Sequence, residues 1–267
     1  MKRIPSPGPP HFAGLLLGVL VLAACSSPAA RTQANRDRDA QVVANAVRQL
    51  DLSGARFSMD NQLVYRGGSV PSGQELVFQS SSTNGTFKDG QARFEYRFTK
   101  SSKPAVYDMV VDESRLFVKA HSGSSWKTLP AGDAAVLLPL ARLETIRQTV
   151  LLARDVGGAT VNFAGGGLYR KYRVTPAGPQ LEQLEGVVFS GGDETAFLKT
   201  ASGEVDVFLT LTEKKLARVE AHLKGVDPQS HTVQMIDSSI DLQPSRVSDI
   251  QAPAGATAIQ VSDLFNI

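Results

Sequence analysis

Few side chains in this sequence have the chemistry of a catalytic or metal-binding site. The chain has one thiol, Cys25, and four imidazoles, at His11, His121, His222 and His231. A histidine can activate a neighbouring nucleophile as a general base, or bind zinc with other histidines and thiolates. No two of these histidines have the spacing of a metal-binding motif, and the G-x-S-x-G, Walker and H-E-x-x-H motifs are absent from the sequence. These features favour a protein that is not an enzyme and that uses no metal and no cofactor.

Cys25 follows a segment with the features of a secretory signal. Lys2 and Arg3 form a basic start, an apolar run leads from Phe12 to Ala24, and small residues directly precede the cysteine. The run is shorter than the ~20 apolar residues that span a bilayer. The ending Leu-Ala-Ala-Cys resembles the lipobox of bacterial lipoproteins, in which the leader is cut before the cysteine and the cysteine is acylated. An ordinary secretory signal with an unrelated cysteine is the alternative.

The lipobox divides the chain into three predicted parts. Residues 1–24 are a lipoprotein signal peptide, residues 25–38 are the lipidated cysteine with a flexible tether, and residues 39–267 form one domain. Loss of the leader removes two of the 28 basic residues and leaves 26, equal to the 26 acidic residues. A chain with no net charge and no basic cluster cannot neutralise a row of phosphates, so nucleic acid is excluded as a partner. We expect a lipid-anchored protein on the extracytoplasmic face of the cell membrane.

The period of the apolar residues changes along the domain. Helical spacing predicts a helix over 39–50 and helices within 131–156, and Pro179 is expected to start a short helix that runs to Val188. Elsewhere the period is two, which is typical of strands with one apolar face. The strands expected on this pattern lie at 57–65, 91–98, 105–111, 116–120, 159–163, 168–174, 205–211, 217–223 and 233–242.

Turns and breaks complete the predicted order of elements. The dipeptides Asn84-Gly85 and Asp89-Gly90 are strong turn signals and are expected between strands. Residues 244–267 contain Pro244, Pro253 and Gly255 and are expected to be largely irregular. Many antiparallel strands around a helical segment predict an α+β fold, in which a strongly curved antiparallel sheet, or half-barrel, packs over helices.

The apolar face of the predicted sheet is the candidate site. A filled core and a cavity lined for a hydrophobic ligand need the same residues, so both interpretations stay open at this point. The candidate ligand-binding residues lie on the strands and on the inner face of the 131–156 helices: Phe57, Met59, Phe94, Tyr96, Phe98, Tyr107, Met109, Leu140, Leu143, Val150, Val207 and Leu209.

The order of elements and several local segments resemble a known family. These segments are Trp126–Pro130, Tyr169–Val174, Val205–Leu209 and Ser248–Pro253, between a lipobox with an N-terminal helix and the end of the chain. The chain is similar to the LolA/LppX-like superfamily of bacterial envelope lipoproteins, which includes the LppX- and LprG-type lipid-binding lipoproteins. The resemblance implies a half-barrel over helices with a hydrophobic cavity that binds or ferries acyl lipids or glycolipids. It implies no catalytic residue, and no family motif identifies individual ligand contacts.

Two functions from different classes follow. The first is a lipoprotein that binds or transfers a hydrophobic acyl lipid or glycolipid in the cell envelope, with an envelope transporter or acceptor protein as a further partner. The second is an accessory or scaffold lipoprotein that holds a protein partner on its outer surface. A hydrolase would require His121, His222 or His231 to meet a nucleophile and a carboxylate in space.

Overall fold

The structure is a computed structural model that describes most of the predicted domain. The described residues are 28–50, 53–67, 75–100, 103–112, 114–138, 143–144, 147–148, 150–151, 155–164, 167–176, 200–226 and 231–266. Cys25, Leu140 and the helix predicted from Pro179 to Val188 lie outside these residues.

One sheet dominates the fold. Its strands are β1 (Ala55–Arg66), β2 (Glu75–Lys88), β3 (Gln91–Lys100), β4 (Lys103–Asp112), β5 (Arg115–Ala120), β6 (Lys127–Pro130), β7 (Asp155–Val156), β8 (Thr160–Ala164), β9 (Gly167–Thr175), β10 (Ser202–Thr210), β11 (Leu216–Val226), β12 (Val233–Pro244) and β13 (Thr257–Ala258). All nine strands that the sequence predicted are confirmed, with ends that shift by a few residues.

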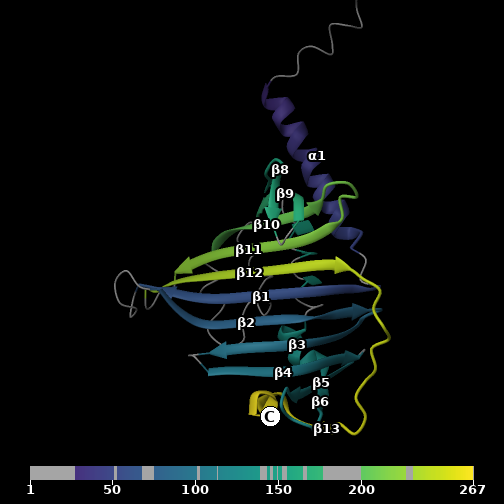
Figure 1. Cartoon of the computed structure of the whole chain (residues 1–267). Helices are drawn as coiled ribbons and strands as arrows, with labels where there is room; N and C mark the ends of the chain where they lie inside the picture. Colours follow the sequence, from purple (N-terminus) through teal and green to yellow (C-terminus); the bar gives the residue numbers. More distant parts are fainter. Residues whose placement is uncertain are drawn as a thin grey trace, which may run out of the picture.

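The strands form an open sheet in the order β13-β6-β5-β4-β3-β2-β1-β12-β11-β10-β9-β7, and β8 pairs with β9 beside β7. Every pairing is antiparallel except the short contact of β13 with β6. Figure 1 shows β8 and β9 at one end of this stack of strands and β13 at the other, so the sheet does not close into a barrel. The predicted α+β half-barrel is therefore confirmed.

Helix α1 (Pro28–Arg48) packs on the sheet through its second half, where Val43, Ala46 and Val47 are buried. The helix begins well before the predicted start at residue 39, so residues 28–38 are helical rather than a flexible tether. Alanine, arginine and glutamine are good helix formers, and proline is favoured in the first turn of a helix. The first half of α1 is polar and carries no apolar stripe, so the hydrophobic pattern did not predict it. No helix in the described part of the chain is both long and apolar enough to cross a membrane.

The predicted helical region 131–156 is partly correct. Residues Ala131–Leu137 form a 3₁₀ helix, η1, with a kink at Ala134, and the described residues between 143 and 151 are helical. The region ends earlier than predicted, because Asp155 and Val156 form β7.

The two turn dipeptides behave differently. Asp89 and Gly90 connect β2 to β3 with positive φ angles of 48° and 84°, as predicted. The predicted turn at Asn84-Gly85 is wrong, because both residues lie inside β2. A Cβ atom on Gly85 would overlap the backbone oxygen of Arg93 and the Cβ of Phe94 on the neighbouring strand. The glycine therefore permits close approach of two strands rather than a reversal of the chain.

The tail is largely irregular, as predicted. Beyond Pro244 it contains only β13 and the 3₁₀ helix η2 (Val261–Asn266) among the described residues. Leu264 of η2 is buried in the main apolar core, so the end of the chain packs on the body of the domain.

The sheet has one apolar and one polar face. On β1, Ala55, Phe57 and Met59 are buried, whereas Arg56 and Asp60 are exposed. We call the face with Phe57 the inner face and the face with Asp60 the outer face. The inner face, α1, Leu143 and Val150 form a single apolar cluster.

We expect Gly85→Ala to lower the free energy of unfolding by about 1–3 kcal/mol, because the added methyl group overpacks the β2–β3 contact. Urea denaturation of the two proteins measures the difference. Gly132→Ala is the matched control, since no atom lies within 4 Å of the added Cβ. Equal stability of the two variants would show that β2 and β3 can separate at no cost.

Candidate functional site

The inner face brings together the predicted ligand-binding residues. Eleven of the twelve lie in or against the main apolar cluster: Phe57, Met59, Phe94, Tyr96, Phe98, Tyr107, Met109, Leu143, Val150, Val207 and Leu209. They come from β1, β3, β4, β10 and the helical segment after η1, which are far apart in the sequence. Leu140 lies outside the described residues, and so does Cys25.

Aromatic rings fill one part of this face. The rings of Phe57 and Phe87 stack with centroids 4.2 Å apart, and Phe94 lies 6.2 Å from Phe57. Phe87 was not among the predicted site residues, although its place in the period-two pattern of β2 could have identified it. Because these rings are buried against each other, Phe57 and Phe94 serve as packed core at this end of the sheet rather than as the wall of an empty space.

A row of side chains that are small except for Phe98 crosses the middle of the inner face. The strand register aligns its members from β4 to β11 through Phe98↔Ala105, Ser81↔Phe98, Asn61↔Ser81, Asn61↔Ser238 and Ala221↔Ser238. We call this set the transverse row: Ala105, Phe98, Ser81, Asn61, Ser238 and Ala221.

The transverse row is more open than the rows on either side of it. Ala105, Phe98, Asn61 and Ser238 are half-buried. The neighbouring inner residues Met59, Leu63, Ile236 and Ile240 are at most 6 % exposed. Ser81 and Ala221 are buried, at 8 % and 6 % exposed. The transverse row is therefore a set of mostly small side chains, interrupted by Phe98 and partly accessible, between bulkier buried ones.

The centre of the row is polar. Asn61 donates a hydrogen bond from Nδ2 to Ser81 Oγ over 3.3 Å, and Ser238 Oγ donates to Asn61 Oδ1. This group was not predicted, although the apolar alternation of β1 is interrupted at residue 61. The three side chains place hydrogen-bonding groups in the middle of an apolar face.

A cavity of about 180 Å³ lies where the C-terminal end of α1 meets the β10–β11 turn. It is lined by Ala46, Leu50, Ala55, Leu216 and Leu242, among others. Gln49, Glu213, Lys214 and Lys215 give it a polar rim. Because Ala46, Ala55 and Leu216 also belong to the main cluster, this α1 cavity adjoins the apolar core.

The outer face carries a polar groove of about 520 Å³. It is lined by charged side chains that include Arg97, Arg218, Glu220, His222 and Asp237, and by the serines Ser80, Ser82 and Ser239. Asn61, Ser81 and Ser238 of the transverse row also border it. Asp60 lies in the same groove, where burial and the neighbouring Asp241 raise the pKa of its carboxyl group against the opposing charge of Arg218.

Beside this groove, Asp206 is the most buried charged side chain of the described residues. Its carboxylate accepts two hydrogen bonds from Arg173, of 3.0 and 3.2 Å, and forms an ion pair with Lys171. Burial raises the pKa of Asp206, but the hydrogen bonds and charges of Arg173 and Lys171 outweigh burial and hold that pKa below its usual value. This pairing stabilises a charge that would otherwise be costly on a buried position.

The histidines lie among carboxylates rather than beside nucleophiles. His121 Nδ1 is 3.0 Å from Asp108 and His222 Nδ1 is 2.7 Å from Asp237, and both histidines are exposed. Sequence spacing did not foresee two groups of metal-binding type, Glu95–Asp108–His121 and Asp206–Glu220–His222, because strand pairing assembles them.

In both groups the carboxylates are already paired with cations. Lys119 binds Asp108 over 3.0 Å, and Arg97 binds Glu95 over 2.6 Å. Arg218 binds Glu220 over 2.7 Å, in addition to the two cations on Asp206. We interpret both groups as ion-pair networks of the outer face.

Comparison with known proteins gives a likeness of fold. No family model and no curated protein matches the chain. Among solved structures, LprF from Mycobacterium bovis is 14 % identical, with a TM-score of 0.49. The match covers 86 % of this chain and 100 % of the LprF chain. Lipoprotein LppX from Mycobacterium tuberculosis is 12 % identical, with coverages of 79 % and 96 % and a TM-score of 0.44.

MucB of Pseudomonas aeruginosa, solved with MucA, also matches, at 13 % identity and a TM-score of 0.32 over 85 % of this chain and 64 % of that one. LppX, a member of the family that the sequence resembles, is thus among the matching structures. Identities of 12–14 % concern the fold alone.

We expect Asp206→Asn to lower the free energy of unfolding by about 3 kcal/mol at neutral pH, because it leaves Arg173 and Lys171 without their buried partner. The pKa of Asp206 is lower in the folded than in the unfolded chain, so its stabilising effect is complete above the unfolded value and is lost as pH falls through the folded value. Denaturation at pH 7 and at about pH 3 should show the difference from wild type shrinking with acid.

The control for this prediction is Glu213→Gln. Glu213 pairs with Lys215 over 2.8 Å at an exposed site, so this change should leave stability unaltered. A deficit for Asp206→Asn that is the same at both pH values would contradict the role assigned to its charge.

Proposed function

We propose that this chain is a bacterial envelope lipoprotein that binds an acyl lipid or glycolipid on the inner face of its half-barrel and catalyses no reaction. The observation that carries the proposal is the transverse row, in which four of six inner-face residues stay half-buried beside buried neighbours, and all six but Phe98 are small or polar. Concave, mostly apolar sites with a few polar groups are typical of sites for hydrophobic ligands.

The dimensions of the row suit an acyl chain. It crosses six neighbouring strands, β4, β3, β2, β1, β12 and β11. At ~4.8 Å per strand spacing it extends on the order of 24 Å, longer than the ~15 Å of one bilayer leaflet. Burial of each methylene contributes ~0.8 kcal/mol, so partial burial of one chain along the row gives useful affinity.

The polar centre of the row supplies orientation. Asn61 and Ser238 occupy inner-face positions and are half-buried, and both also border the outer groove. In this proposal their amide and hydroxyl groups are within reach of a ligand on the inner face. An ester carbonyl or a hydroxyl group of the lipid can exchange hydrogen bonds with them. A wholly hydrocarbon ligand would leave this polar group unmatched.

In this proposal the protein is attached to the extracytoplasmic face of the cell membrane through acylated Cys25, after removal of residues 1–24. Release and transfer of the ligand would involve an envelope transporter or acceptor protein. The second candidate, a scaffold for a protein partner, is favoured by the outer polar groove of about 520 Å³. The two functions differ in whether lipid reaches the inner face.

The test uses the full chain in cells fed a photoactivatable fatty acid that carries a click handle. After irradiation, we expect light-dependent crosslinks to peptides of β1, β2 and β12, located by mass spectrometry. Ser238→Phe should lower these crosslinks severalfold, because the ring fills the transverse row. Ser239→Phe is the matched control on the same strand, since Ser239 pairs with Asp60 and so alternates to the outer face.

Urea denaturation of both variants shows whether a loss of crosslinks comes from a blocked row or from a misfolded chain. If Ser238→Phe does not fold, Ala105→Phe blocks the row from β4 instead. Crosslinks that stay undiminished in folded Ser238→Phe or Ala105→Phe would contradict a site in the row. An absence of crosslinks in wild type would favour the protein-partner scaffold.

The same labelled cells test the anchor. Cys25 should carry the fatty acid without irradiation, because its attachment is covalent. We expect Cys25→Ser to abolish this light-independent label. The variant should either leave the membrane fraction as a mature chain or stay there with its leader uncleaved, and its mass distinguishes the two. Retention of the light-independent label in Cys25→Ser would exclude Cys25 as the acylated residue.

A further inference from the structure

Large apolar side chains gather in an exposed position at one end of the sheet. Among the described residues, three of the five exposed large hydrophobic side chains lie on two neighbouring hairpins: Val161 and Leu168 on β8–β9, at 58 % and 52 %, and Leu211 after β10, at 40 %. Isolated exposed apolar residues are ordinary, but a group of them marks an interaction surface.

The strand register brings these three residues together. Tyr169 pairs with Thr210 on one side and with Asn162 on the other. Leu168 and Leu211 therefore lie at the same end of β9 and β10, and Val161 lies beside them on β8. We call Val161, Leu168 and Leu211 the hairpin-end patch.

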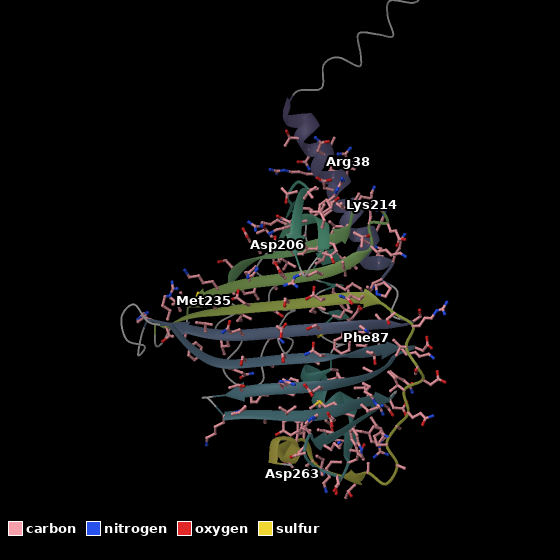
Figure 2. The ribbon with its side chains drawn as sticks, viewed as in Figure 1. Arg38, Phe87, Asp206, Lys214, Met235 and Asp263 are labelled. Atoms are coloured by element: carbon pink, nitrogen blue, oxygen red, sulfur yellow. The ribbon has the colours of Figure 1, made fainter. Side chains whose placement is uncertain are left out.

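Cations surround the hairpin-end patch. Arg170 pairs with Val161 across β8 and β9, and Lys214 lies in the β10–β11 turn next to Leu211, both exposed. The exposed half of α1 adds Arg36 and Arg38. Figure 2 shows Arg38 and Lys214 in the same upper part of the molecule, at the end opposite to Asp263.

Acidic groups at this end are fewer than the basic ones. Glu213 is paired with Lys215, and Asp37 accepts a hydrogen bond from Gln33. Asp39 faces Gly158, just before β8, which places α1 beside this hairpin. Five basic residues, Arg36, Arg38, Arg170, Lys214 and Lys215, thus stand against three acidic ones in a chain whose predicted mature form has no net charge.

Helix α1 relates this end of the sheet to the predicted lipid anchor. Figure 1 shows α1 rising from the β10–β12 part of the sheet on the side of β8 and β9. The helix begins at Pro28, three residues after Cys25. Three residues span at most about 11 Å, so a lipid on Cys25 would hold the start of α1 close to the bilayer.

We propose that the hairpin-end patch and its cations dock on the surface of an anionic lipid bilayer. Exposed apolar tips that enter the headgroup region, together with Lys and Arg that attract anionic lipids, are the combination by which proteins bind membrane surfaces. The α1 cavity has Lys214 and Lys215 on its rim, so docking turns this opening, and the apolar core that adjoins it, toward the bilayer.

The test places an environment-sensitive fluorophore at single introduced cysteines in the full chain. Leu168→Cys and Leu211→Cys report on the patch. Val261→Cys is the matched control, because Val261 is also an exposed apolar residue, at 48 %, but lies in η2 at the opposite end of the sheet. The unsubstituted chain shows whether any label reaches Cys25.

In vesicles of phosphatidylcholine and phosphatidylglycerol, labels at 168 and 211 should shift to shorter wavelength and brighten severalfold, and the label at 261 should not. Vesicles of phosphatidylcholine alone, or Arg170→Glu combined with Lys214→Glu, should remove most of the shift. The proposal is overturned if positions 168 and 261 respond alike, or if the shift at 168 grows with protein concentration without vesicles, which indicates self-association. This readout does not depend on lipid in the transverse row, so it can fail while the proposed function holds.

Discussion

The strict alternation of side chains along each strand, with apolar residues toward one face of an open sheet, is the constraint on which this structure depends. A sheet that closes into a barrel covers its own inner face, but this one ends at β13 and at β7 with β8. The apolar face must therefore be covered by other elements. The second half of α1, Leu143, Val150 and Leu264 join the same cluster and provide this cover within the described residues. The cover consists of separate elements, so it need not match the sheet at every row.

The sheet itself is uneven in the bulk of its inner side chains. At the Phe57–Phe87 end, stacked rings fill the space, as in an ordinary core. Across the middle, the transverse row has a polar centre and small residues at all positions but Phe98, and it stays partly accessible. One apolar face thus combines a tightly packed part, which stabilises the fold, with a less tightly covered row. The distinction rests on the side chains at a few aligned positions and not on a change of fold.

Charge is separated from the apolar face and divided between two regions. Across the outer face, Asp206, Asp108 and Glu220 are each neutralised by lysine or arginine, which makes this surface a network of internal pairs. At the end that carries α1, basic residues outnumber acidic ones next to exposed Leu168 and Leu211. The first arrangement uses charge to stabilise the domain, whereas the second places an excess of positive charge beside exposed apolar residues.

The sequence by itself determined nine of the strands and the class of fold, because period-two alternation is a local property that burial enforces, but it did not predict β2, β6, β7 or β13. It also identified eleven residues of the apolar cluster, since any large apolar residue at an inner position must be buried. It misjudged residues 28–38, where polar helix formers leave no hydrophobic pattern, and Gly85, whose role depends on a neighbouring strand. Only the tertiary structure decided that Asn61, Ser81 and Ser238 meet across three strands, that carboxylates and histidines gather on the outer face, and that Leu168 lies beside Leu211. Each of these depends on strand register between distant segments, which pairing in space specifies and local sequence does not.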